Sequence, residues 1–108
     1  MPHELPDRLQ QFNCWRAAWH IITCEYFRPT DRRLWSHVDL KHESLHFDRI
    51  LAEGTWSSTE ELMLRAAWSL FDYECQVNLY RLMNCLDDIQ ARVLHQAMDI
   101  LAGRAPRW

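Results

Sequence analysis

The feature that most limits the fold of this chain is the scarcity of residues that interrupt helices. The 108 residues include only two glycines and four prolines. All six lie near the expected ends of helices, at Pro2, Pro6, Pro29, Gly54, Gly103 and Pro106. A sheet with many turns needs more residues of this kind, and the chain contains no alternating strand of useful length. The sequence therefore predicts an all-α protein.

Apolar residues recur every three or four positions along several stretches, which is typical of helices with one buried face. The expected helices cover residues 7–27, 31–37, 40–53, 58–72 and 88–102, with a short helix carrying Leu79 to Leu86. Ser57 and Glu60 form an S-x-x-E capping box, and Asn78 caps the short helix. We predict an irregular bundle of five to six helices in a single domain, 1–108, with frayed ends at 1–6 and 104–108.

The same spacing assigns most large apolar side chains to the core. The expected core residues of the first and last helices are Leu9, Phe12, Trp15 or Arg16, Trp19, Ile22, Tyr26, Ile89, Val93, Ala97, Ile100 and Leu101. Trp68 is expected to be buried as well. Trp35, on a short segment, and Trp108, beyond Pro106, have the weakest structural explanation among the six tryptophans. Because aromatic side chains often anchor interfaces, these two are the candidate interaction residues.

Residues 42–46 read HESLH, the H-E-x-x-H pattern of zinc peptidases. On the expected helix 40–53, His42 and His46 would share one face and Glu43 would act as general base. A catalytic zinc needs a third protein ligand, and Ala52 stands where the metzincin pattern has its third histidine. The pattern arises by chance in about one chain in fifty of this composition. We therefore interpret it as accidental and expect no bound zinc and no other cofactor.

A second arrangement would bring four zinc ligands together. His20 and Cys24 are also spaced by four residues, so they would share a face of the first helix. If that face met the helix 40–53, these two residues together with His42 and His46 would close a structural zinc site. A zinc-binding protein, or a minimal metallopeptidase that uses HESLH, is therefore the alternative to a chain without metal.

The four cysteines form two pairs, Cys14–x9–Cys24 and Cys75–x9–Cys85. This spacing is similar to that of the twin C-x9-C helical hairpin proteins of the mitochondrial intermembrane space. In that family the two helices follow one another closely, whereas about fifty residues separate the pairs here. We expect four reduced, partly buried thiols instead.

Charge and hydropathy exclude several classes of partner. The net charge is −3, and the 12 basic residues are spread along the chain without a block, which argues against a nucleic-acid binder. No apolar run approaches the roughly 20 residues of a membrane span, and the polar start MPHELPDRLQ is unlike a secretory signal. We expect a cytoplasmic protein. All but one of the basic residues are arginine, which indicates a GC-rich, bacterial coding genome.

Residues 55–103 resemble the C-terminal half of small bacterial helical proteins of unknown function. The resemblance rests on W-S-S before a helix, then L-R-A-A-W-S-L, V-N-L, L-D-D and a closing helix. It implies a bacterial intracellular origin and a helical fold, and it implies no activity. With no complete catalytic set in the sequence, we expect a non-enzymatic protein that binds another protein in a regulatory or inhibitory role. Its oligomeric state stays open.

Overall fold

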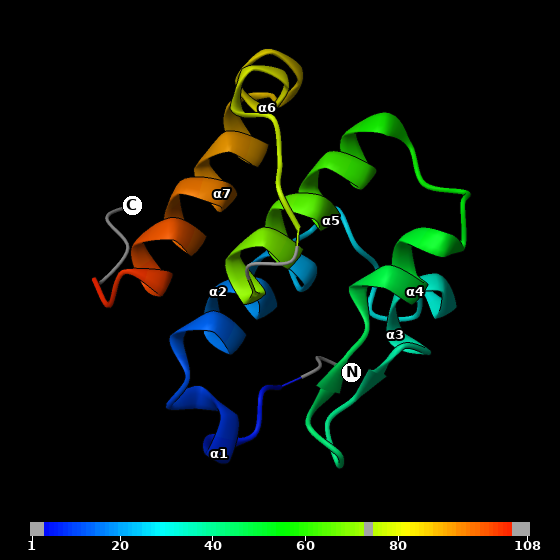
Figure 1. The fold of residues 1–108 in the computed structure, drawn as a ribbon, viewed down its shortest axis with the longest axis vertical. Helices are drawn as coiled ribbons and strands as arrows, with labels where there is room; N and C mark the ends of the chain where they lie inside the picture. Colours follow the sequence, from blue (N-terminus) through cyan, green and yellow to red (C-terminus); the bar gives the residue numbers. More distant parts are fainter. Residues whose placement is uncertain (1–3, 73–74, 105–108) are drawn as a thin grey trace.

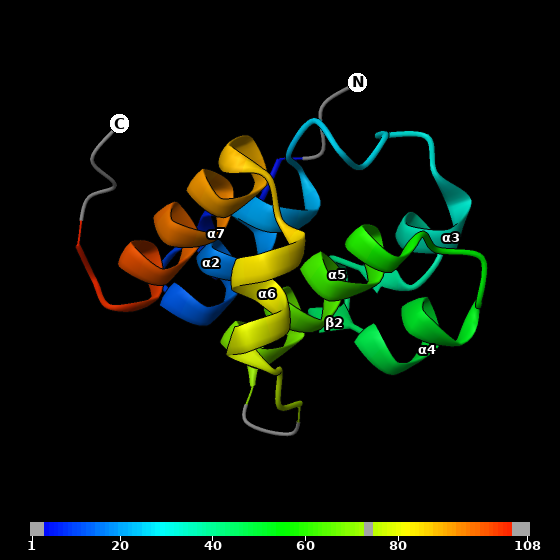
Figure 2. The same cartoon turned by 90° about the horizontal axis from the view of Figure 1, so that it is seen from above.

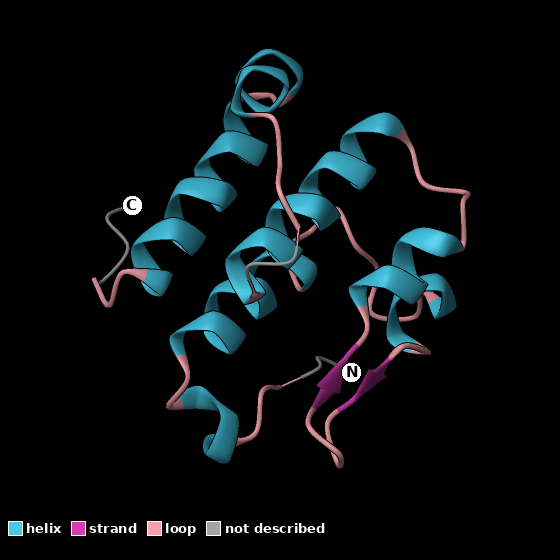
Figure 3. Ribbon diagram, in the orientation of Figure 1, coloured by secondary structure: helices cyan, strands magenta, loops and turns pink. Residues whose placement is uncertain are grey.

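The computed structural model describes residues 4–72 and 75–104 and shows a mostly helical chain (Figures 1 and 3). The elements within these ranges are α1 (Asp7–Gln10), α2 (Asn13–Ile22), α3 (Arg32–Trp35), β1 (Val38–Asp39), β2 (Ser44–Leu45), α4 (Phe47–Ala52), α5 (Ser58–Phe71), α6 (Leu79–Cys85) and α7 (Asp88–Leu101). The predicted helical class is confirmed in this coarse form. The predicted number of helices is not, because the described residues contain seven helices and a two-stranded hairpin. No helix in these ranges is long and apolar enough to span a membrane.

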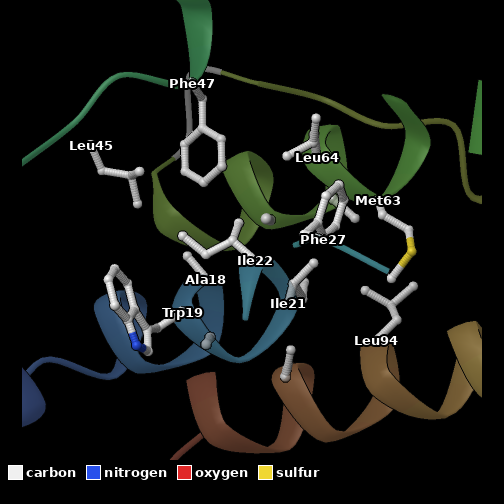
Figure 4. Close-up of a cluster of buried hydrophobic side chains, with 14 of the residues drawn as sticks. Ala18, Trp19, Ile21, Ile22, Phe27, Leu45, Phe47, Met63, Leu64 and Leu94 are labelled. Carbon is white, nitrogen blue, oxygen red and sulfur yellow. The ribbon is translucent and has the colours of Figure 1, made fainter. Parts of the chain in front are cut away.

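Helix α2 lies at the centre of the fold and packs against both α5 and α7. Its side chains Ala17, Ala18, Ile21 and Ile22 are fully buried. The small alanines allow the neighbouring helices to approach closely, and the isoleucines fill the remaining space. Figure 4 shows Ile21 and Ile22 of α2 beside Met63 and Leu64 of α5, with Leu94 of α7 on the other side. The core therefore joins segments that are far apart in the sequence.

The predicted helix 7–27 is wrong, because the chain forms two helices there. The backbone of Phe12 is extended, with φ −103° and ψ 114°, and this separates α1 from α2. Leu9 is buried as expected, whereas Phe12 is 48% exposed and lies outside the core. Helix α2 ends at Ile22, where the Thr23 hydroxyl donates a hydrogen bond of 2.6 Å to the Trp19 carbonyl. Such a side-chain bond competes with the continuation of a helix.

The predicted helix 40–53 is also wrong, because a hairpin replaces its first half. Val38 pairs with Leu45 and Asp39 with Ser44 in antiparallel register. Glu43 has φ +56°, a left-handed conformation that no α-helix contains. Only α4 remains helical in this range. The side chains of Leu45 and Phe47 are both buried, so the core takes every second residue here, which is the period of a strand.

The C-terminal helices match their predicted bounds within one or two residues. Helix α5 begins with the predicted capping box, in which Glu60 N–H donates to Ser57 Oγ and Ser57 N–H donates to the Glu60 carboxylate. Helix α7 has an equivalent box between Asp87 and Gln90. Gly54 and Gly103 have φ +75° and +78°, as expected of left-handed residues at helix ends.

The predicted core is confirmed in part. Trp15, Trp19, Ile22, Ala97 and Ile100 are buried, and Tyr26, Trp68 and Val93 are half-buried. Ile89 and Leu101 were predicted to face inward and are exposed, because α7 buries a stripe through Gln90, Leu94, Ala97 and Ile100. Leu5 is buried within a segment expected to be frayed. The candidate residue Trp108 lies outside the described residues.

Candidate functional site

The three key residues of HESLH do not share a helical face. His42 lies in the turn of the hairpin, and its Nδ1 lies 2.6 Å from Asp39 Oδ2. This hydrogen bond lowers the pKa of the Asp39 carboxyl. Glu43 forms an ion pair with Arg8 of α1. His46 is the residue before α4 and is half-buried. The helical spacing that would direct both histidines at one metal is therefore absent from this segment.

The second proposed zinc arrangement also lacks its geometry. His20 Nε2 lies 2.7 Å from Gln96 Oε1, so this histidine faces α7. Burial raises the pKa of the Cys24 thiol, which disfavours the thiolate that would bind zinc. Among residues 4–72 and 75–104, no three histidine, cysteine, aspartate or glutamate side chains are grouped so that they would hold a metal ion. The four candidate ligands His20, Cys24, His42 and His46 are not brought together.

Elemental analysis tests the metal question directly. We expect the purified, folded protein to carry no stoichiometric zinc, because the HESLH segment is a hairpin. A chelator should leave the circular dichroism spectrum and the melting temperature unchanged. About one zinc per chain that is lost when both His42 and His46 are replaced by alanine would contradict this expectation.

All four cysteines are unpaired in the structure, and their environments differ. Cys75 is buried and its burial raises the pKa of its thiol, whereas Cys85 is exposed at the end of α6. Cys14 and Cys24 are half-buried. The members of the Cys75–x9–Cys85 pair therefore differ in burial, whereas Cys14 and Cys24 have the same burial class, and neither pair is joined by a disulfide in the structure.

Reduction is accordingly expected to leave the melting temperature nearly unchanged. A native disulfide that closes a long loop contributes about 2–4 kcal/mol, which is a change of many degrees for a domain of this size. The measurement is a pair of thermal melts with and without a phosphine reductant. A drop of several degrees on reduction would restore the twin C-x9-C interpretation.

Trp35 contacts other residues of the fold, although the sequence did not predict a structural role for it. Its ring packs edge-on against Trp19, with the ring centroids 5.3 Å apart. Its indole N–H donates a hydrogen bond of 3.0 Å to the Arg28 carbonyl. The side chain is half-buried. Its role in binding a partner stays a prediction, and these contacts give it a role in holding α3 and residue 28 in place as well.

The most exposed apolar side chains lie on and beside α6. Leu79 is 65% exposed, Tyr80 78% and Met83 55%, and Ile89 in the first turn of α7 is 51% exposed. We call these four residues the α6 face. Leu82 is the buried residue of α6, so this helix contributes little to the core. Figures 1 and 2 show α6 at one end of the molecule, beside the start of α7.

A polar hollow of about 290 Å³ lies beside the N-terminal end of α6. Its lining residues are Glu61, Leu62, Arg65, Gln76, Val77, Asn78 and Arg81. The Arg65 guanidinium is paired with Glu61 at 3.0 Å. The exposed Arg81 extends from α6 itself, next to Tyr80 of the apolar face. Apolar and basic side chains therefore adjoin on this short helix.

A second, larger hollow of about 480 Å³ lies between residues 26–33 and the start of α5. We call it the arginine hollow, and its lining residues are Tyr26, Arg28, Thr30, Asp31, Arg32, Arg33 and Glu60. The Arg33 side chain makes two hydrogen bonds to the Asp31 carboxylate, of 3.1 and 2.8 Å, and one of 2.9 Å to the Thr55 carbonyl. These bonds from Arg33 hold the pKa of Asp31 below its usual value. This cluster was not predicted from the sequence, because the basic residues are dispersed along the chain.

We compared the chain with known protein families, with curated proteins and with solved structures, and none of the three comparisons found a match. The resemblance of residues 55–103 to small bacterial helical proteins therefore stays a prediction.

Proposed function

We propose that this chain is a non-enzymatic intracellular protein that acts by binding another protein through the α6 face. The observation that carries the proposal is the exposure of Leu79, Tyr80 and Met83 on one short helix. A single exposed apolar side chain is ordinary on a protein surface, whereas a group of large ones marks an interaction surface. Tyrosine and methionine are also among the residues enriched at protein interfaces.

The position of α6 suits such a role. Met83 neighbours both Leu79 and Tyr80 on the helix surface, because it lies four and three positions after them. Leu82 faces the core, so the helix is fixed while these other apolar side chains stay in water. Covering them with a partner would stabilise the complex by removing apolar surface from water. A binder of this kind would regulate or inhibit its partner by occupying a surface of it.

The charge beside the α6 face indicates the chemistry of the partner. Arg81 is exposed on α6, whereas Arg65 in the hollow at the start of the helix is already paired with Glu61, so Arg81 supplies the charge available to a partner. A partner that presents apolar side chains flanked by carboxylates would match this arrangement and reject basic surfaces. The proposed partner surface is therefore apolar with an acidic edge.

Replacing both Tyr80 and Met83 with alanine is expected to weaken partner binding by roughly tenfold or more, since truncation of central interface residues commonly has this effect. Both side chains are mostly exposed, so the melting temperature should change little. The partner is first isolated with tagged protein, then purified and titrated by calorimetry. Met98→Ala, at a comparably exposed methionine on α7, is the matched control and should bind as the parent does.

Equal binding by the parent protein and the double variant would exclude the α6 face. Sedimentation of the chain alone provides a separate check. If the chain forms a dimer that Tyr80→Ala and Met83→Ala abolish, the occupant of the face is a second copy of this chain and not a different protein.

A further inference from the structure

We propose that the arginine hollow binds a small phosphate-bearing molecule, with Arg28 and Arg32 as the residues that contact its phosphate. This site is separate from the α6 face, and it does not depend on the proposed function. The proposal rests on the size and polarity of the hollow, on two guanidinium groups that form no ion pair with any carboxylate of residues 4–72 and 75–104, and on the fixed backbone from which they project.

The size of the hollow fits a small molecule. Its volume of about 480 Å³ falls in the range of roughly 300–1,000 Å³ that small-molecule sites occupy. Its lining is chiefly polar, with the hydroxyl groups of Tyr26 and Thr30 beside the charged side chains. The Tyr26 hydroxyl already donates a hydrogen bond of 3.1 Å to the Asp87 carboxylate, whereas an apolar ligand would take water away from the exposed charged groups, so the lining favours a polar, charged ligand.

Some charged groups of the hollow have hydrogen-bond or ion-pair partners within the described residues, and others do not. Arg33 and Asp31 satisfy each other through their paired hydrogen bonds. The Glu60 carboxylate accepts a hydrogen bond from Ser57 N–H within the capping box. In the described part of the chain, no carboxylate forms an ion pair with Arg28 or Arg32. The lining therefore carries three guanidinium groups and two carboxylates, an excess of one positive charge, and an anion in contact with Arg28 and Arg32 would balance it.

The backbone that carries these two arginines is held in place before any ligand binds. The Arg28 carbonyl accepts hydrogen bonds from Trp35 Nε1 at 3.0 Å and from Asp31 N–H at 3.1 Å. Arg33, next to Arg32, is anchored to the Thr55 carbonyl, and its guanidinium carbon lies 4.0 Å from the centroid of the Trp56 ring. A ligand would order only the exposed ends of two side chains, which lowers the entropic cost of binding.

Phosphate suits these donors better than a carboxylate does. A guanidinium donates several hydrogen bonds from one plane and matches the oxygens of phosphate in pairs. A phosphate monoester has three terminal oxygens, so two guanidinium groups and the Thr30 hydroxyl would share them. A single carboxylate carries one negative charge on two oxygens, whereas a phosphate monoester carries about −1.5 to −2 on three, so succinate, which has two carboxylates, is the probe matched in charge.

Binding is tested by calorimetry at fixed ionic strength with three probes, which are inorganic phosphate, ribose 5-phosphate and succinate. We expect saturable binding of one or both phosphate probes and weaker binding of succinate. Tighter binding of ribose 5-phosphate than of inorganic phosphate would show that the hollow holds an organic phosphate. The reverse order would show that the free ion is the ligand, and both orders support the proposal.

Variants then assign the residues. Arg28→Gln and Arg32→Gln should each weaken phosphate binding by about tenfold or more, since a charge-assisted hydrogen bond is lost. Arg49→Gln removes the same charge from the exposed face of α4 and should bind as the parent does. Circular dichroism confirms that each variant folds. The proposal is overturned if no phosphate probe binds saturably, if succinate binds as tightly as phosphate, or if Arg49→Gln loses as much affinity as the hollow variants.

Discussion

Replacing Trp19 with alanine is expected to lower the free energy of unfolding by about 3–5 kcal/mol, as truncation of a large core residue does. Trp19 is buried on α2, the helix that packs against both α5 and α7 (Figure 4). Its ring also supports Trp35, so its removal leaves a void on two sides. Domains of this kind are stable by about 5–15 kcal/mol, so the change removes a large fraction of the total. Urea titration followed by far-UV circular dichroism measures it.

Trp35→Ala provides the comparison. Trp35 is half-buried and loses one ring contact and the hydrogen bond to Arg28, so a smaller effect of about 1–2 kcal/mol is expected. Because the two rings touch, the double variant should lose less than the sum of the single ones, by about 0.5–1.5 kcal/mol. If Trp35→Ala unfolds the protein and Trp19→Ala does not, the assignment of Trp19 to the core and of Trp35 to the surface is wrong.

Replacing Phe47 with alanine is expected to cost about 3–5 kcal/mol as well. Phe47 is the first residue of α4 and is almost fully buried. Its ring lies 6.3 Å from that of Trp68 in a stacked arrangement and 5.7 Å from that of Phe71, measured between centroids. The packing of Phe47 against these two rings therefore holds the hairpin and α4 against α5. In the Phe47→Ala variant, amide hydrogen exchange should show that the backbone amides of β1, β2 and α4 lose protection before those of α2 and α7 do.

The matched control for Phe47 is Phe12→Ala. Phe12 is 48% exposed and lies between α1 and α2, so its truncation should change the stability by no more than about 0.5 kcal/mol. Similar losses for Phe12→Ala and Phe47→Ala would contradict the placement of these two rings.

Local signals made the C-terminal half of the fold predictable. The Ser57–Glu60 capping box and the glycines at 54 and 103 depend on neighbouring residues alone, and each is formed as expected. The long periodic patterns of α5 and α7 carry enough turns to define a helix. Their exact buried stripe was less predictable, since Gln90 rather than Ile89 faces the core of the folded chain.

The hairpin was not predictable from these signals. Each strand has two residues, and the turn contains no Asn-Gly or Asp-Gly pair. Glu43 adopts a left-handed conformation that its residue type does not indicate. The alternation of Leu45 and Phe47 was the available clue, whereas the spacing of apolar residues over 40–53 favoured a helix instead.

Both candidate sites depend on tertiary structure in the same way. Leu79 and Met83 follow helical spacing, and only the fold shows that no neighbour in the described chain covers them. Arg28 and Arg32 look like two of many dispersed basic residues until α5 closes one side of the hollow. Apolar spacing and residue counts do not contain this information.

The central position of α2 has a consequence for biosynthesis. The chain leaves the ribosome from its N-terminus, so α2 is made long before α5 and α7, the two helices that cover it. Until α7 is complete, Ile21 and Ile22 have no full set of apolar neighbours. Nascent chains should therefore stay protease-sensitive and attract chaperones until the last helix emerges, and the protein should acquire its fold in a late step.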